Sequence, residues 1–261
     1  MLLQDFLAAR GVLWLLIKRE FRGRYAGSNF GVLWNLVHPI VLIMIYITVF
    51  SRLMGSSSNR GGSAYMVHMT SGMVPWLLFS EILNRSCNVL LENSSMLKKM
   101  AIPEEVLFLS VFVTSFTIYG ISVTALMILL LALGAPLTPG VLFVFPVMVL
   151  LGLSALGIGM ILSVLNLFVR DVAQFVTIAL NICMWSLPIV YFPSILPPTI
   201  LYYSKLNPIY GFFSLIQRLF GSPEAHFNPD SLWTILLLPF FAMLAGMSFL
   251  RSKRSEILDT L

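Results

Sequence analysis

The sequence predicts an all-α, polytopic membrane protein, and its composition and the spacing of its charged residues support this fold class. Hydrophobic residues make up 58% of the 261 residues, charged residues only 10%, and the mean hydropathy is +0.92. A typical soluble domain is about a quarter charged, so this chain has too little polar surface to cover a water-facing globule. Its charges are also clustered, which leaves long uncharged segments between them.

The uncharged segments predict six transmembrane helices. They cover residues 25–51, 61–80, 106–169, 172–204 and 231–250. A bilayer core of about 30 Å takes about 20 helical residues, so the segment 106–169 must hold two spans, divided by the turn-forming sequence Gly134-Ala-Pro-Leu-Thr-Pro-Gly140. Backbone groups in lipid must bond internally, which favours helices. We expect spans near 31–53, 65–86, 106–133, 141–165, 173–191 and 232–250.

The distribution of Lys and Arg predicts that both termini are cytoplasmic. An even number of spans places the termini on one side, and that side then holds twelve of the 16 Lys and Arg residues. Cytoplasmic segments are enriched in these residues. The net charge of +5 comes from cations beside apolar spans, so it fits an anionic membrane surface, and no nucleic-acid partner is expected.

Residues 2–24 precede the first span and are predicted to form a helix in the cytoplasmic membrane interface. Apolar residues, Leu16 among them, share one face of the helical wheel, and the cations lie away from it. Arg22, Arg24 and Tyr25 are the candidate residues for contacting a lipid phosphate. The alternative is an ordinary positively charged flank of the first span.

The segment 91–105 is predicted to be a short cytoplasmic helix that couples the membrane domain to a partner. It mixes apolar residues with charges of both signs, as a helix that docks in a groove requires. With the loop after the fourth span, it supplies the candidate docking residues Lys98, Lys99, Pro103, Glu104, Glu105, Arg170 and Asp171. A solvated loop is the alternative for 91–105.

The segment 192–231 is strongly apolar but interrupted by proline and glycine, including Pro193, Pro197, Pro208 and Gly221. One intact span does not fit this sequence. Short helices that re-enter the outer leaflet do fit, if protein or a water cavity covers their free backbone groups. The alternative is an apolar external loop at the level of the lipid head groups.

Aromatic residues gather near the ends of several expected spans. Aromatic rings stack on sugars without holding them tightly, which suits a path for a moving glycan. The candidate path residues are Trp34, Trp76, Phe79, Trp185, Tyr191 and Phe192. An interfacial aromatic belt is the alternative interpretation of these residues.

No constellation typical of a catalytic or metal site is evident. Cys87 and Cys183 lie in or near apolar segments without CxxC spacing, which favours small core residues over a redox pair. His38, His68 and His226 do not share the spacing of a metal site, so no metal is expected. The sequence contains no Gly-Lys dipeptide and therefore no Walker A motif, so the chain is not expected to hydrolyse ATP.

Two spans carry residues at helical spacing. Glu81 and Arg85 are four residues apart near the inner end of the second span, where they form either a functional site or a local ion pair. Ala155, Gly159 and Ser163 recur every four residues on the fourth span, which predicts a small-residue packing face.

Several motifs occur in order along the chain: Arg24–Pro39, Phe168–Val172, Pro188–Tyr191, Asn207–Ile209 and Arg218. Together they resemble those of the ABC-2 type permeases that export polysaccharides and teichoic acids. The resemblance implies a homodimer in the bacterial inner membrane with two copies of a separate ATPase, which binds ATP and Mg, and no cofactor in this chain. It implies export of an undecaprenyl-linked glycan, reducing end first, from the cytoplasmic face.

Within this family the sequence is most similar to O-antigen transport permeases, with capsule and teichoic acid exporters as alternatives. An ion-coupled secondary transporter usually carries charges at the membrane midplane, and the uncharged segment 106–169 argues against that class. An integral-membrane glycosyltransferase needs catalytic charges near one membrane face. Its only acidic candidates there, Glu104, Glu105 and Asp171, fit docking charges better.

Overall fold

The computed structural model describes a helical protein. The described residues are 10–25, 37, 41, 44, 61–99, 102–135, 137–223, 225 and 227–260. Their helices are α2 (Arg10–Tyr25), α4 (Gly61–Glu92), α5 (Ser94–Lys99), α6 (Glu104–Ala132), η2 (Pro139–Phe143), α7 (Val144–Phe168), α8 (Val172–Ser186), η3 (Pro193–Ile195), α9 (Pro198–Leu206), α10 (Tyr210–Leu219), α11 (Ser231–Ser252) and α12 (Arg254–Thr260). Apart from three single residues, the expected first span at 31–53, with Trp34, lies outside this part of the chain.

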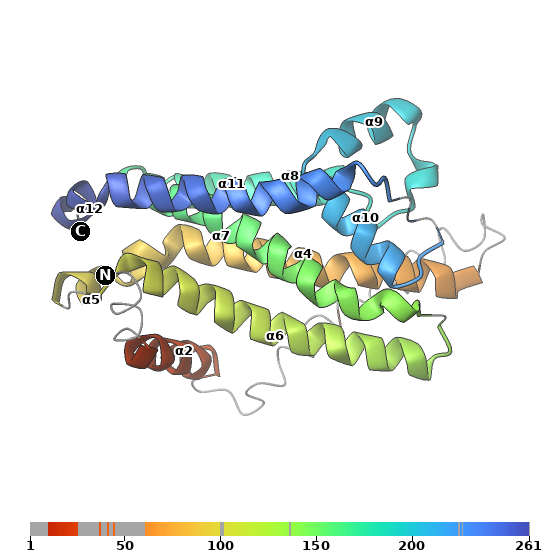
Figure 1. The fold of residues 1–261 in the computed structure, drawn as a ribbon, viewed down its shortest axis with the longest axis horizontal. Coiled ribbons are helices and arrows are strands. Elements are labelled where there is room, and N and C mark those ends of the chain that lie inside the picture. The colour runs from red at the N-terminus through yellow and green to blue at the C-terminus, as the bar shows by residue number, and fades with distance from the viewer. Residues whose placement is uncertain are drawn as a thin grey trace.

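The long helices run side by side as a bundle (Figure 1). At its centre, α7 packs against both α4 and α11, while α6 packs against α4 and α2 packs against α6. Within the described residues, Glu104–Ala132, Pro139–Phe168 and Ser231–Ser252 are long and apolar enough to cross a membrane, and Val172–Ser186 is a shorter apolar helix. The prediction of an all-α, polytopic membrane protein is therefore confirmed, whereas the count of six spans stays a prediction.

A turn divides the longest uncharged segment, as the sequence predicts. Helix α6 ends at Ala132, and Gly134 adopts a left-handed backbone conformation with φ of 73°. The Ala135 amide donates to the Leu130 carbonyl at 2.9 Å, so one of the carbonyls left free at the C-terminal end of α6 has a hydrogen-bond partner. The hydroxyl of Thr138 donates to the carbonyl of Leu219, which ties this turn to α10.

Small residues let α7 approach its two neighbours closely. A Cβ atom at Gly159 would overlap the Cβ of Ser86 on α4, so the expected packing face is in place. A second contact was not expected from the sequence. A Cβ at Gly157 would overlap the backbone of Ala242 on α11, and one at Gly246 would overlap the Gly157 carbonyl. Close backbone packing of this kind is typical of helices in membranes. The hydrophobic effect does not drive helices together there, and small residues allow the close van der Waals packing that does.

The proline-rich segment before α11 folds into short helices. Of these, α10 is buried over most of its length and packs against α4, α7 and α11. By contrast, α9 leaves Tyr202 and Tyr203 exposed. Short helices agree with the sequence, but their re-entry into a membrane is a separate matter and stays a prediction.

Candidate functional site

The two ends of the bundle carry different groups. Figure 1 places α2, α5, α12 and the C-terminus at one end, and α9 and α10 at the other. The loop between α7 and α8, which contains Arg170 and Asp171, follows the end of α7 that lies beside α12. The structure therefore collects the expected cytoplasmic residues at one end and the expected outer segment at the other, and we name these the coupling end and the outer end.

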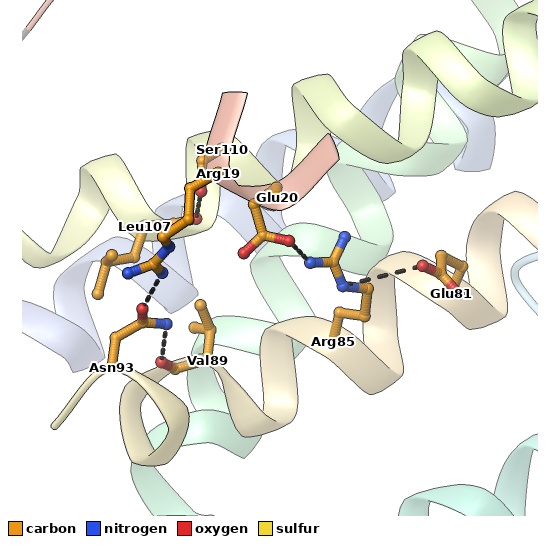
Figure 2. Close-up of polar contacts among 8 residues, drawn as sticks. All are labelled: Arg19, Glu20, Glu81, Arg85, Val89, Asn93, Leu107 and Ser110. Atoms are coloured by element: carbon orange, nitrogen blue, oxygen red, sulfur yellow. Dashed lines mark hydrogen bonds and ion pairs between the residues drawn. The ribbon is translucent and has the colours of Figure 1, made fainter. Parts of the chain in front are cut away.

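At the coupling end an ion-pair cluster joins α2 to α4 (Figure 2). The Arg85 guanidinium on α4 donates to the carboxylate of Glu20 on α2, and its Nε lies 3.8 Å from the Glu81 carboxylate. The exposed fractions of the Arg85 and Glu20 side chains are only 22% and 15%. A local ion pair of Glu81 with Arg85 was one of the two alternatives from the sequence, but the closer partner of Arg85, Glu20, is 65 residues away along the chain.

A second contact joins α2 to the junction between α4 and α5. The guanidinium of Arg19 donates to the side-chain oxygen of Asn93 and lies 3.5 Å from the sulfur of Met96 on α5. Figure 2 shows Asn93 turned toward Arg19, while its amide nitrogen donates to the Val89 carbonyl at 2.8 Å. Arg19 and Glu20 are adjacent on α2, so this helix contacts both the long helix α4 and the short helix α5, which covers only Ser94–Lys99 of the expected helix at 91–105. We name the Glu20–Arg85 and Arg19–Asn93 pairs the α2 latch.

The expected docking charges fall into two groups. Glu104 and Glu105 at the start of α6 pair with Arg254 at 3.2 Å and Arg251 at 3.4 Å, and the Glu104 side chain is only 5% exposed. Both carboxylates are paired within the chain, and the buried Glu104 is poorly placed for a partner, whereas the Glu105 side chain is 27% exposed. The docking role of these two residues stays a prediction. Lys98, Arg170 and Asp171 are exposed, Pro103 is half-buried, and the side chain of Lys99 lies outside the described residues.

The N-terminal helix turns its expected apolar face toward the protein. Leu16 is only 3% exposed in the core next to α6, whereas Trp14 and Leu15 are 65% and 66% exposed. The outward residues of α2 are therefore Trp14 and Leu15, which did not belong to the apolar face of the helical wheel. Arg22 is exposed on the same helix, and the side chains of Arg24 and Tyr25 lie outside the described part.

The structure separates the expected path aromatics. Trp76 and Phe79 are each 4% exposed and pack with Phe213 in the core, and Phe192 is buried against Tyr65 and Met69. Side chains buried inside one subunit cannot line a path at its surface, so these three residues leave the candidate path. Trp34 lies outside the described residues.

Trp185 and Tyr191 remain as candidate path residues at the outer end of α8. Trp185 is 50% exposed, and the hydroxyl of Tyr191 donates to the Trp185 carbonyl at 2.6 Å. This bond fixes the tyrosine ring beside the last turn of α8, the turn that carries Trp185.

Polar residues extend this aromatic pair along α8. Gln174, Thr177 and Asn181 are exposed and recur at helical spacing in line with Trp185. A polar side chain that faces lipid is costly, so this stripe fits a second subunit or a water-filled path better. These three residues were not among the candidates predicted from the sequence, although their spacing within an uncharged span was a usable signal.

The thiols and other potential ligands do not form a metal site in the described part of the chain. Cys87 is buried and Cys183 is half-buried, and both are free. Groups of three or more His, Cys, Asp or Glu side chains close enough to hold a metal ion are absent from the residues that the structure describes.

Long apolar helices, a latch of charged residues at one end and a broken apolar segment at the other define a multi-pass helical membrane protein. The sequence model of the ABC-2 type transporter family matches residues 11–220. The chain belongs to this family, so the expectation of a transporter permease is confirmed.

Three proteins of known function are similar to the chain in sequence. An O-antigen export system permease (RfbA) of Myxococcus xanthus is 26% identical over 265 residues, with 100% of this chain and 99% of the relative covered. An O-antigen export permease of Klebsiella pneumoniae is 25% identical, with 76% and 75% covered. A polysialic acid transport protein (KpsM) of Escherichia coli is 27% identical over 81 residues, with 31% of each chain covered.

Proposed function

We propose that this chain is the permease subunit of an ABC transporter that exports lipid-linked O-antigen across the bacterial inner membrane. The observation that carries the proposal is the alignment with an O-antigen export permease over the whole length of both chains. A capsular polysaccharide is the second candidate substrate, because a polysialic acid transport protein aligns with about a third of the chain. Membership of a transporter family leaves the glycosyltransferase interpretation without support.

In the proposed arrangement six spans cross the membrane and both termini are cytoplasmic. The spans are the segment 31–53 and helices α4, α6, α7, α8 and α11, and the segment with α9 and α10 re-enters the outer leaflet. The support is that the coupling end holds α2, α5 and the C-terminus while the outer end holds α9 and α10. Trp14 and Leu15 on the outward face of α2 would then anchor this helix in the interface.

The arrangement gives a topology prediction that thiol labelling can check. A cysteine at Asn228 should react with a membrane-impermeant maleimide added to intact cells, and a cysteine at Ser252 should react only after permeabilisation. Both positions are exposed in the structure, unlike Ser222, which is buried and would give no signal in either case. Labelling of Ser252→Cys but not of Asn228→Cys in intact cells would contradict this topology and place the C-terminus outside.

Two permease subunits would enclose the path, and two partner ATPases would bind ATP and Mg. A long glycan cannot occupy a fixed internal site, and a pore between subunits fits the polar stripe on the exposed face of α8. Stacking rings and neutral polar groups hold a sugar chain weakly, which allows transit. At the coupling end, the exposed Lys98, Arg170 and Asp171 are the proposed contacts with the ATPase.

The path is tested by removing the aromatic pair. In cells that depend on this chain for surface glycan, Trp185→Ala with Tyr191→Ala should lower export about tenfold, which corresponds to a loss of about 1.4 kcal/mol of interaction between the aromatic rings and the moving sugar chain. Pulse labelling of surface glycan measures the rate. The matched control is Trp233→Ala, which removes another exposed tryptophan, 68% exposed against 50% for Trp185, from α11 and should leave export unchanged. Equal export by both variants would assign Trp185 and Tyr191 to the interfacial belt.

A further inference from the structure

A buried histidine at the outer end connects three segments that are far apart in the sequence. His68 on α4 is 0% exposed, and its Nδ1 lies 2.8 Å from the hydroxyl of Ser222. Its Nε2 lies 3.1 Å from the carbonyl oxygens of both Pro188 and Tyr191. The amide of Gln217 on α10 donates to the Pro188 carbonyl at 3.1 Å and to the His68 carbonyl at 3.3 Å. We name these five residues the His68 hub.

The hydrogen bonds define the proton on the imidazole. The Nε2 atom of His68 faces two carbonyl oxygens, which only accept, and it lies 3.3 Å from the Gln217 amide nitrogen. The two hydrogens of that amide have the Pro188 and His68 carbonyls as acceptors, so Nε2 carries the proton that serves the carbonyls. The hydroxyl of Ser222 can then donate to the unprotonated Nδ1 of the neutral ring. A phenylalanine or leucine of similar size would leave the Tyr191 carbonyl without the imidazole donor and the Pro188 carbonyl with the Gln217 amide alone, and a buried unpaired carbonyl is costly.

The neighbouring residues of α4 form a surface on which the same turn rests. The hydroxyl of Tyr65 donates to the Val190 carbonyl at 2.8 Å. One helical turn beyond His68, Gly72 leaves room for the turn and for α10, since a Cβ there would lie 2.8 Å from the amide nitrogen of Gln217 and 3.1 Å from Ile189. The side chains of Tyr65 and His68 therefore fix the backbone from 187 to 191 by hydrogen bonds, and Gly72 allows it to lie close to α4.

The fixed turn ends at Tyr191, one of the two candidate path residues, and follows the last turn of α8, which carries the other, Trp185. The carbonyl of Tyr191 accepts from His68, and the hydroxyl of Tyr191 donates to the Trp185 carbonyl. Tyr191 therefore belongs both to the His68 hub and to the aromatic pair. We propose that His68 is a positioning residue for transport: it holds residues 187–191 so that Trp185 and Tyr191 face the glycan. This inference rests on the proposed function, because it assigns the aromatic pair to the path.

The experiment compares three variants in surface-glycan export and in hydrogen exchange of the purified permease–ATPase complex. His68→Leu removes the donor, and His68→Gln keeps an N–H group within reach of the two carbonyls. Thr70→Val is the matched control, since Thr70 is 1% exposed two residues away but bonds only within its own helix. His68→Leu should lower export about tenfold and speed amide exchange at 187–191, while His68→Gln and Thr70→Val should stay within about threefold of the wild type.

The outcomes separate the hub from the function it serves. Export by His68→Leu equal to that of Thr70→Val, or faster exchange at 187–191 with unchanged export, overturns the positioning role. If His68→Leu does not accumulate, Ser222→Ala removes one bond with little change of volume, and unchanged export and exchange in that variant also overturn it. A wild-type chain that restores no surface glycan contradicts the proposed function instead, and leaves the exchange result to report on the hub alone.

Discussion

Replacing Gly157 with alanine is expected to destabilise the purified protein by about 3 kcal/mol, because the added methyl group has no space on either side of the α7–α11 contact. The new Cβ would overlap the backbone of Ala242 and lie 2.6 Å from the amide nitrogen of Met243. Backbone atoms cannot rotate away as a side chain would, so the two helices have to separate along their length. The melting temperature of the detergent-solubilised protein, and the fraction that stays monodisperse, measure the effect.

Gly120→Ala is the matched control for this substitution. Gly120 also lies within a long apolar helix, α6, but a Cβ there would meet no atom within 4 Å. Alanine has the higher helix propensity, so this variant should be as stable as the wild type or slightly more stable. Gly246→Ala should resemble Gly157→Ala, since its Cβ would overlap the carbonyl of Gly157. Three equally stable variants would show that α7 and α11 do not pack as closely as described.

The fold class and the division of the chain could be predicted because both depend on composition and on strong local signals. The uncharged segment 106–169 is too long for one span, so it must contain a turn. Glycine and proline residues cluster at 134–140, and the structure places Gly134 in the left-handed backbone conformation that favours glycine. The packing face around Gly159 was predictable for a similar reason, since four-residue spacing of small residues has few other causes in a span.

The rotation of each helix could not be predicted, because a membrane helix is apolar on all sides. Leu130 and Leu131 of α6 are both leucine, and only the tertiary structure shows that the first is fully buried and the second is 61% exposed. The same difficulty explains the path residues. Trp76 and Trp185 both lie in apolar spans, yet one is buried in the core and the other is half exposed. Exposed polar residues such as Asn181 were the better signal, since they are costly in lipid.

Contacts between distant segments were also beyond the sequence. Glu104 lies with Glu105 at the end of the segment 91–105 that was expected to be a cytoplasmic helix, which suggested a docking charge, but its partner Arg254 lies 150 residues further along the chain. The His68 hub illustrates the same limit: three histidines without metal spacing gave no reason to choose His68, whose importance comes from the carbonyls of Pro188 and Tyr191.

Removing Glu20 is expected to uncouple ATP hydrolysis from export. In Glu20→Ala the nearest carboxylate left to Arg85 is that of Glu81 at 3.8 Å, and the Nη1 atom of Arg85 is already buried without a hydrogen-bond partner among the residues that the structure describes. Breaking a mostly buried ion pair costs about 2–3 kcal/mol, so α2 should detach from α4 in a large fraction of the molecules. Because the latch also joins α2 to the start of α5, a displacement of α5 by the ATPase would no longer move α2 and α4 together.

The measurement is export of surface glycan together with ATP hydrolysis by the purified complex. Glu20→Ala should lower export about tenfold while hydrolysis continues, and Glu20→Arg combined with Arg85→Glu should restore part of the export. The matched control is Glu256→Ala, which breaks the exposed pair with Lys253 at the same end of the bundle and should change export little, because exposed pairs contribute about 0–1 kcal/mol. If Glu20→Ala exports as well as Glu256→Ala, the latch is only a structural contact and the movement of α5 must reach α4 through the chain junction at Asn93.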